Sequence, residues 1–394
     1  MSSKQQFTAT VSRGLEDALS RELQGLGVGG VKTGKGAVYF SGDIKSAYRV
    51  CLWSRIATRV LLPLVTFKAW NEAELYEGTL GVDWSEHVRP DSSICVDFVG
   101  RPRWLNNSMF GAVRVKDAVV DQLRDTRGSR PSVNRDNPDL RINVHAGRDE
   151  VVISVDLSGD PLHERGAGRI EGPAPLKETL AAGLLSISNW RKLARDGAPL
   201  VDPMCGSGMF LVEAAGIAFD RAPGMNRRHW GFARWPGHDK LAWRQMIKEA
   251  RERAADQNNQ NITIIGGDVD PRAVEAAEAN LRRAGVLDKV QLRQASLEKM
   301  MPPKGKEGIV VANPPYGERL GTLDEAAEIH HALGEHLWQN YQGWTGWILT
   351  AHGPLVGKVG MKPAKRIQVY NGPIECRWLC FPVRKRASTS DVQG

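Results

Sequence analysis

Residues 313–316, the tetrad Asn-Pro-Pro-Tyr, carry the strongest chemical signal in the sequence. They follow the apolar run 308–312, which predicts a buried strand. Proline fixes its own φ and donates no backbone hydrogen bond, so this strand should end in a rigid corner. The carbonyl groups of Asn313 and Pro314 can each accept an N–H, and Tyr316 can stack on a flat ring. Such a corner could hold an amine-bearing ring in one pose, with Pro315 stiffening it.

A glycine-rich turn lies upstream, between the apolar run 199–201 and the apolar start of a helix at 209–215. The turn reads Asp202-Pro-Met-Cys-Gly-Ser-Gly208. Glycines let the backbone approach a ligand closely, and the helix N-terminus offers free N–H groups. No Gly-Lys-Ser/Thr follows, so the turn is not a P-loop. The third glycine of the dinucleotide fingerprint is also missing.

Between these two motifs, residues 262–270 predict an apolar strand that ends in two acids. In a doubly wound α/β sheet, ligands bind at the carboxyl ends of the strands. We therefore expect Asp268 to bind the two hydroxyls of a ribose. Asp270 is expected to cap the helix 272–283, with Pro271 at the first helical position. The alternative is that both acids are only caps or turn residues.

The composition limits the class of protein. A length of 394 residues suggests two or three domains, and 41% hydrophobic residues suffice for sizeable cores. The net charge of +8 favours a polyanionic partner. Five scattered cysteines indicate a reducing compartment, and neither a signal peptide nor a membrane-spanning run is apparent, so we expect a cytoplasmic protein. Only Cys376 and Cys380 are close in sequence, and no second Cys/His pair is near them, so no metal site is expected.

Composition shifts divide the chain into five regions, and the predicted fold class is α/β. Residues 1–65 and 66–157 each mix helices and strands, 158–175 form a Gly- and Pro-rich linker, 176–383 alternate strands and helices, and 384–394 form a disordered tail. In the first two regions the patterns predict helices at 12–26, after Asp43 and at 106–123, strands at 36–40 and 93–99, and a hairpin of 141–145 with 150–157 around Gly147.

Two basic segments are candidates for binding RNA. Residues 227–235 interleave cations and aromatic rings, which suits single-stranded or looped RNA. The alternative is a loop whose tryptophans pack on the domain while the arginines are solvated. Region 66–157 is rich in arginine, and its alternative is a solvated helix face. The candidate RNA-binding residues are Arg101, Arg103, Arg114, Lys116, Arg130, Arg135, Arg228, Trp230 and Arg234.

Taken together, these stretches resemble one family, the bacterial 23S rRNA guanine-N2 methyltransferases of the large subunit. The matching residues span nearly the whole chain: 12–16, 115–121, 156–163, 174–182, 202–208, 221–224, 230–232 and 313–320. The resemblance implies a ferredoxin-like region at 1–65, a THUMP RNA-binding domain at 66–157 and a Rossmann-like class I methyltransferase domain at 176–383. It also implies that S-adenosylmethionine is the cofactor.

The resemblance assigns the remaining site residues. Those implied to bind the cofactor are Lys177, Thr179, Asp202, Met204, Cys205, Gly206, Ser207, Gly208, Asp268, Val269, Ser296, Leu297 and Asn313. The chain departs from the pattern in two ways. Ser296 stands where many class I methyltransferases place an Asp that binds adenine. Some relatives carry a second, N7-methylating domain, and we expect none here, so a single activity is predicted.

The expected function is methylation of the exocyclic N2 amine of a guanine in 23S rRNA or its large-subunit precursor, with no membrane partner. Three alternatives stay open. A tRNA guanine-N2 methyltransferase would share the domain pairing, and Asn-Pro-Pro-Tyr also serves DNA adenine-N6 methyltransferases. A non-catalytic RNA-binding assembly factor could retain the cofactor fold. The combination of Asp202, Gly206, Gly208, Asp268 and Asn313 disfavours a pure binder, which has no use for a complete site.

Overall fold

The structure, a computed structural model, describes residues 4–166, 168–170, 175–257, 261–315, 322–351 and 353–385. The contacts divide the chain into two compact units. The first unit contains residues up to Val11, Leu19–Gly166 and Arg227–Lys248. The second contains Ser12–Ala18, the residues that lead up to Asn226 and those from Glu249 onward. No helix in the described part of the chain is both long enough and apolar enough to cross a bilayer.

The first unit is built on a mixed sheet whose strand order, over the described residues, is β2-β3-β1-β4-β8-β7-β5-β6. The strands are β1 (Gln5–Thr10), β2 (Gly29–Gly34), β3 (Ala37–Gly42), β4 (Arg59–Lys68), β5 (Ser93–Gly100), β6 (Ser132–Val133), β7 (Leu140–Ala146) and β8 (Glu150–Asp156). The predicted hairpin is confirmed, because β7 and β8 pair antiparallel. Strand β4 was not predicted. It contains Pro63 at a shift of register, where a strand tolerates a residue that lacks an N–H.

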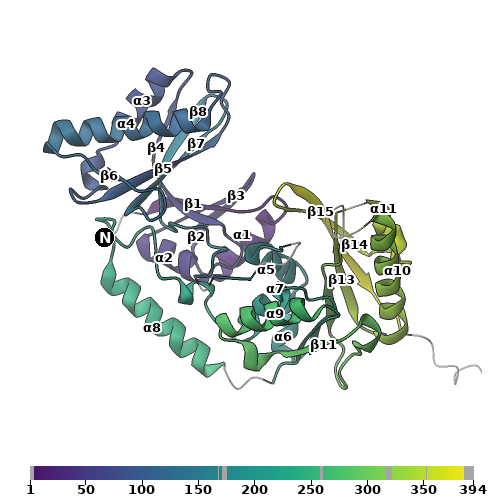
Figure 1. Cartoon of the computed structure of the whole chain (residues 1–394). Helices are drawn as coiled ribbons and strands as arrows, with labels where there is room; N and C mark the ends of the chain where they lie inside the picture. Colours follow the sequence, from purple (N-terminus) through teal and green to yellow (C-terminus); the bar gives the residue numbers. More distant parts are fainter. Residues whose placement is uncertain are drawn as a thin grey trace, which may run out of the picture. The chain divides into compact units, whose positions relative to one another are not determined.

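The helices in this part of the chain are α1 (Glu16–Gly25), α2 (Ile44–Trp53), α3 (Glu72–Leu80), η1 (Trp84–Glu86) and α4 (Ser108–Arg127). Helix α2 begins after Asp43 as predicted, and the Asp43 side chain caps it by accepting a hydrogen bond from the N–H of Ser46. Asn107 caps α4 in the same way. Helices α3 and α4 lie together on one face of the strands β4, β5, β7 and β8 (Figure 1).

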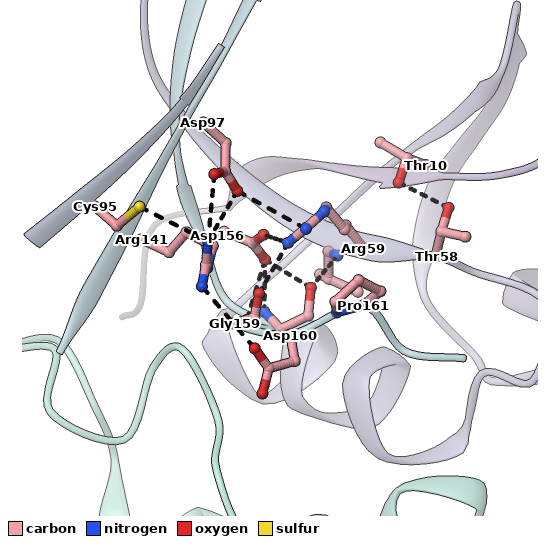
Figure 2. Close-up of polar contacts among 12 residues, drawn as sticks. Thr10, Thr58, Arg59, Cys95, Asp97, Arg141, Asp156, Gly159, Asp160 and Pro161 are labelled. Carbon is pink, nitrogen blue, oxygen red and sulfur yellow. Dashed lines mark hydrogen bonds and ion pairs between the residues drawn. The ribbon is translucent and has the colours of Figure 1, made fainter. Parts of the chain in front are cut away.

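A polar cluster joins the middle strands of the first unit, and Figure 2 shows its members. Arg59 on β4 donates hydrogen bonds to the buried carboxylate of Asp156 and, at 2.8 Å, to the carbonyl of Gly159. Arg141 on β7 pairs with Asp97 on β5 at 3.2 Å. Buried charges need such partners to offset the loss of water. Arg59 and Arg141 are therefore committed to holding strands together.

The second unit contains the sheet that positions the site, with the order β11-β10-β9-β12-β13-β15-β14 over the described residues. Its strands are β9 (Leu200–Asp202), β10 (Ile264–Asp268), β11 (Gln291–Gln294), β12 (Ile309–Ala312), β13 (Thr345–Thr350), β14 (Lys365–Asn371) and β15 (Ile374–Pro382). Strands β9 to β13 are parallel, and β15 pairs antiparallel with β13. The chain order reverses between β9 and β12, which makes their carboxyl ends a topological switch point.

Helices pack on both faces of this sheet. They are α5 (Glu178–Ile187), α6 (Trp190–Arg195), α7 (Met209–Ala218), η2 (Pro223–Asn226), α9 (Pro271–Arg283), η3 (Leu287–Lys289), η4 (Leu297–Lys299), α10 (Leu323–Asn340) and α11 (Gly353–Lys358). Helices α5, α7 and α9 lie on one side, and α10 and α11 on the other (Figure 1). Buried residues of β12, β13, α10 and α11 form one continuous apolar core, which includes Val310, Leu333 and Ile348.

One segment behaves differently from what the sequence suggests. Residues Arg227–Lys248 fall inside the predicted range 176–383, yet they pack with the first unit; α8 (Lys240–Asp256) begins within them. Phe232 is fully buried there, with its ring 4.5 Å from that of Tyr48 and 4.9 Å from that of Trp243. The hydroxyl of Tyr48 also lies 2.7 Å from His238 Nδ1. Burial of these rings accounts for the placement of the segment.

Candidate functional site

The carboxyl ends of β9, β10 and β12 open into a cavity of about 510 Å³ in the second unit. The lining residues come from the ends of strands and the turns after four of them, from helices α7, α9 and α10, and from Leu176 just before α5. They are Leu176, Asp202, Pro203, Met204, Cys205, Gly206, Ser207, Met209, Phe210, Asp268, Val269, Asp270, Ala273, Ala295, Ser296, Leu297, Glu298, Asn313, Pro315, Ile329 and Ala332. The cavity thus lies where the switch point of the sheet predicts a ligand.

Asp202 ends β9 and is almost completely buried. One of its oxygens accepts a hydrogen bond from the N–H of Met204 at 3.2 Å. Burial raises the pKa of Asp202 well above its ordinary value, and the nearby carboxylate of Asp268 adds to the rise. A cation or an N–H donor in the cavity would stabilise the ionised form of Asp202.

The glycines of the turn are required by its backbone. Gly206 and Gly208 have φ values of 51° and 79°, in the left-handed region that favours glycine. A Cβ on Gly208 would also lie 2.9 Å from the Cβ of Ala277 on α9, which is too close. The turn therefore leads into the N-terminus of α7 in a backbone conformation that residues other than glycine could adopt only with strain.

Asp268 at the end of β10 ties two loops together. Its oxygens accept hydrogen bonds from the N–H groups of Gly206, at 2.9 Å, and Asp270, at 3.0 Å. Asp270 caps α9 as predicted, accepting from the N–H of Arg272 at 2.9 Å, and Pro271 is the first helical residue. This hydrogen bond lowers the pKa of Asp270. Asp268 lines the cavity in the position expected of a group that binds hydroxyls.

Asn313 follows β12 directly, and its side-chain oxygen is the most informative atom of the site. That oxygen is buried and has no hydrogen-bond partner among the described residues. Buried polar groups without partners are few in native structures, and each calls for an explanation. Because Asn313 lines the cavity, a ligand N–H is the natural donor. Pro315 also lines the cavity, whereas Tyr316 lies outside the described residues.

Most of the predicted cofactor residues meet at this cavity, but some do not. The predicted cofactor residues Lys177, Thr179 and Gly208 do not line it; Lys177 is exposed and Thr179 is buried. Pro314, from the predicted catalytic set, is buried between the two lining residues Asn313 and Pro315. The sequence reasoning missed further lining residues, which are Leu176, Pro203, Met209, Phe210, Asp270, Ala273, Ala295, Glu298, Ile329 and Ala332. Glu298 had a local signal, since it lies two residues after Ser296. Ile329 and Ala332 had none, because α10 follows β12 after a long connection.

The lining has a clear charge character. It contains four carboxylates, Asp202, Asp268, Asp270 and Glu298, and no lysine, arginine or histidine among the described residues around it. A phosphate-bearing ligand would be repelled by this set, whereas a positively charged ligand with N–H and O–H donors suits it. A sulfonium nucleoside that carries an ammonium group has this chemistry. The residues present therefore fit S-adenosylmethionine.

The candidate RNA strip at 227–235 is largely occupied by structural contacts of the first unit. Arg227 donates to the backbone carbonyls of Ser158, Asp160, Pro161 and Glu164. Trp230 stacks on Phe232 with 5.5 Å between ring centroids. Arg234 pairs with Asp91 and Asp139, each at 3.0 Å. These contacts favour the packing alternative for Trp230 and Arg234, while Arg228 is exposed.

The other RNA candidates lie in the first unit, on or beside α4. Arg101, Arg103, Arg130 and Arg135 are exposed. The guanidinium of Arg114 lies over the ring of Tyr76, 4.3 Å from its centroid, and Lys116 is ion-paired with Asp117. Four of the six side chains thus face solvent, and the RNA role of all six stays a prediction. Within the described residues, no group of three or more His, Cys, Asp or Glu side chains is arranged to hold a metal ion.

Comparisons with known proteins agree with this picture. The sequence model described as "RMKL-like, methyltransferase domain" matches residues 165–379, more than half of the chain. The "RlmL ferredoxin-like domain" matches residues 6–61, and the THUMP domain matches 69–156. A Methylococcus capsulatus protein named "Ribosomal RNA large subunit methyltransferase K/L" is 43% identical over 96% of this chain and 51% of its own length. The chain spans about half the length of the curated relatives that it matches.

Among the solved structures that resemble nearly all of this chain are two of about 30% identity. SMU.472, described as a putative methyltransferase complexed with SAH, is 30% identical with a TM-score of 0.87, over 98% of this chain and 100% of its own. A protein from Listeria monocytogenes, described as a predicted N6-adenine-specific DNA methylase, is 30% identical with a TM-score of 0.84, over 97% of both chains. The Rossmann-like methyltransferase fold is therefore confirmed. Because SMU.472 holds SAH, the demethylated product of S-adenosylmethionine, the predicted cofactor is confirmed at the level of the family. The chain belongs to the RMKL-like methyltransferase family and carries a THUMP domain ahead of its methyltransferase domain.

Proposed function

We propose that this chain transfers a methyl group from S-adenosylmethionine to the exocyclic N2 amine of a guanine in 23S rRNA. One observation carries the proposal: the buried oxygen of Asn313, without a partner among the described residues, lies on an acid-lined cavity at the switch point of the sheet. A hydrogen-bond acceptor at that position could orient the amine of the substrate toward the cofactor.

Within the cavity, the residues have separable tasks toward the cofactor. Asp268 is placed to accept hydrogen bonds from the ribose hydroxyls, because its carboxylate lies at the carboxyl end of β10. The turn from Asp202 to Gly208 brings backbone and a buried carboxylate to the methionine part. The sulfonium supplies an already electrophilic methyl group. The remaining task of the protein is therefore to align the amine.

Asn313 and the carbonyl of Pro314 would accept hydrogen bonds from both hydrogens of the amine. The lone pair of a guanine N2 is delocalised into the ring, and two acceptors favour a more pyramidal and more nucleophilic nitrogen. Holding the reacting groups in line gives effective molarities of roughly 10⁵–10⁸ M in well-oriented systems. Tyr316, which lies outside the described residues, would stack on the extruded base and offset part of the cost of unstacking it, a few kcal/mol.

The assignment of RNA as substrate rests on the first unit. The THUMP domain match covers residues 69–156, and the curated relatives are named as ribosomal RNA methyltransferases. The net charge of +8 and the exposed arginines of that region suit a phosphate backbone. We further place the reaction in the cytoplasm, where ribosomal RNA is made and where thiols such as Cys51 and Cys205, both free here, stay reduced.

A second candidate function is methylation of adenine N6 in DNA. It is favoured by the Listeria monocytogenes structure, which carries that description and matches nearly the whole chain. An amide acceptor beside a proline corner suits the exocyclic amine of adenine as well as that of guanine. The THUMP domain weighs against this candidate, because it points to RNA.

The deciding experiment is incubation of the purified chain with methyl-labelled S-adenosylmethionine and separate nucleic acids. The substrates are 23S rRNA from cells that lack the modification, total tRNA and adenine-containing duplex DNA. We expect label in the rRNA, mapped to N2 of one guanine. Label only in tRNA or only in DNA adenine would replace the proposed substrate. Binding of cofactor with no label in any substrate would support a non-catalytic RNA-binding factor.

A further inference from the structure

We propose that Ser296 and Glu298 together recognise the 6-amino group of the cofactor's adenine, with Glu298 as the acceptor and Ser296 as the residue that orients it. The inference rests on the proposed function only in taking S-adenosylmethionine as the ligand. The family pattern leads one to expect an Asp at position 296, and the chain has a hydroxyl there instead. The structure shows a carboxylate on the same turn, two residues later.

The position of the turn follows from the strand order. The sheet runs β11-β10-β9-β12, so the turn after β11 lies next to Asp268 on the side away from Asn313. Asp268 is paired in register with Gln294, and the N–H of Ala295 donates to the carbonyl of Asp268 at 3.0 Å. Neighbouring strands are about 4.8 Å apart, so Ser296 and Glu298 begin one strand spacing beyond the expected ribose site. A nucleoside bound through Asp268 would extend its base toward them.

The turn after β11 is fixed by buried residues, while the carboxylate of Glu298 remains available to a ligand. Leu297 and Met300 are buried in the apolar core between the sheet and α10, which fixes η4. Ser296 and Glu298 both line the cavity, and Glu298 is exposed. The exposed side chain of Val269 and the side chains of Ala273 and Leu297 provide apolar surface along the same part of the cavity. A flat base can lie against that surface with its amine toward the acid.

The hydroxyl and the carboxylate act as a pair. The side chain of Ser296 hydrogen-bonds the carboxylate of Glu298, which is the main reason that the pKa of Glu298 is lowered. A hydroxyl has one proton to donate, so Ser296 serves Glu298 and leaves the other lone pairs of the carboxylate free for a ligand N–H. Asp270, the other acid nearby, already accepts from the backbone and the side chain of Arg272. Glu298 is therefore the better acceptor for an exocyclic amine.

The test is binding, measured by calorimetry on the full chain, of two ligands that differ at the 6-amino edge of the purine. They are S-adenosylhomocysteine and its deaminated analogue S-inosylhomocysteine, which carries an oxygen in place of the 6-amino group and a proton on N1. A site built to accept from an amine rejects the analogue, and loss of one charge-assisted hydrogen bond corresponds to at least about a tenfold weaker affinity. We expect the wild type to prefer S-adenosylhomocysteine by at least that factor.

Two variants and one control locate the source of the preference. Glu298→Gln can donate to the oxygen of the analogue, so the ratio of the two affinities should fall to near one. Ser296→Ala should reduce the ratio partially, because the acceptor remains but loses its orienting partner. Glu328→Gln is the control: it makes the same chemical change at an exposed position of α10 that does not line the cavity, and it should keep the wild-type ratio.

The outcomes separate this inference from the proposed function. A wild-type protein that binds both ligands equally, or a Glu298→Gln variant that keeps the wild-type ratio, would overturn the adenine assignment while leaving cofactor binding intact. A wild-type protein that binds neither ligand would instead remove the proposed function, and the adenine assignment with it. Unchanged thermal unfolding of Glu298→Gln will show that a change in the ratio does not come from misfolding, since this side chain is exposed.

Discussion

Two regions of this chain have residue types suited to binding a ligand, and they differ sharply in structure. One is the end of the second unit's sheet, where Asp202, Asp268 and Asn313 meet at a cavity. The other is the strip 227–235 in the first unit, where cations alternate with aromatic rings. At the cavity, the oxygen of Asn313 is buried without a partner among the described residues. In the strip, Arg227 and Arg234 already have polar partners within the unit, and Trp230 is packed against other rings.

The difference teaches how to separate a binding site from a packed loop. Charged and aromatic residues are costly to leave without partners, so a fold satisfies them internally unless a ligand does so. In the strip, the groups with partners inside the protein are less available to RNA, while Arg228 remains exposed. An acceptor that is buried, lines a cavity and has no described donor retains its capacity for a ligand. Residue types suggest a binding site in both regions. What distinguishes the two regions is whether their polar groups already have hydrogen-bond partners within the protein.

The largest expected effect comes from removing the acceptor at the cavity. Asn313→Ala should lower the rate of methyl transfer by about 10³-fold, because the amine loses a group that orients it. Its affinity for S-adenosylhomocysteine should stay close to that of the wild type. Transfer of labelled methyl groups to RNA and calorimetry measure the two quantities. An Asn313→Ala enzyme with unchanged turnover would show that the orphaned oxygen has no role.

The strip gives the converse prediction, a loss of stability. Arg227→Ala removes hydrogen bonds to four backbone carbonyls and should lower the free energy of unfolding by about 2–4 kcal/mol. Arg228→Ala, at the neighbouring exposed position, should change it by less than about 0.5 kcal/mol. Urea denaturation measures both. If Arg227→Ala unfolds like the wild type but binds RNA more weakly, the strip is an RNA surface after all.

Within the cavity, Asp268 and Asp270 allow the same comparison between a group that binds a ligand and a group that stabilises the fold. Asp268→Ala should weaken binding of S-adenosylhomocysteine by about tenfold or more, through loss of charge-assisted hydrogen bonds. Asp270→Ala removes a helix cap and should cost about 1 kcal/mol of stability with little change in affinity. Calorimetry and urea denaturation together distinguish the two acids. Equal effects of the two changes on affinity would contradict the assignment of the ribose to Asp268 alone.

The smallest effect concerns pH. Burial raises the pKa of Asp202 in the folded, ligand-free protein, so this group binds its proton more tightly when folded. Its contribution to stability is full below the unfolded pKa, about 3.9, and is lost as the pH rises through the folded pKa. Asp202→Asn removes this loss, so its stability relative to the wild type should increase as the pH rises above the unfolded pKa. A difference that does not vary with pH would show that Asp202 is ionised in the folded protein.

Local patterns determined much of the fold and most of the site. The glycine turn, the acid at the end of β10 and the Asn-Pro-Pro corner each follow an apolar strand, and parallel strands bring their carboxyl ends to one edge. The cap Asp270 and the start of a helix after Asp43 were also predicted, because these signals depend on residues only two or three positions apart. Strand β4 escaped prediction because Pro63 interrupts its pattern; in the structure a shift of register between Pro63 and Val65, in β4 itself, accommodates the proline.

Tertiary structure alone decided which chemically suitable residues have partners. The sequence identified both Asn313 and Trp230 as candidates, and for Trp230 it left open the alternative of packing on the domain. Only packing revealed that Trp230 rests on Phe232 and that residues Arg227–Lys248 join the first unit. The same holds for Ile329 and Ala332, which reach the cavity from α10. Local spacing along the chain determines which side chains stand in a turn or at the end of a strand. Whether such a side chain contacts a hydrogen-bond donor, an aromatic ring or a ligand depends on residues far away in sequence.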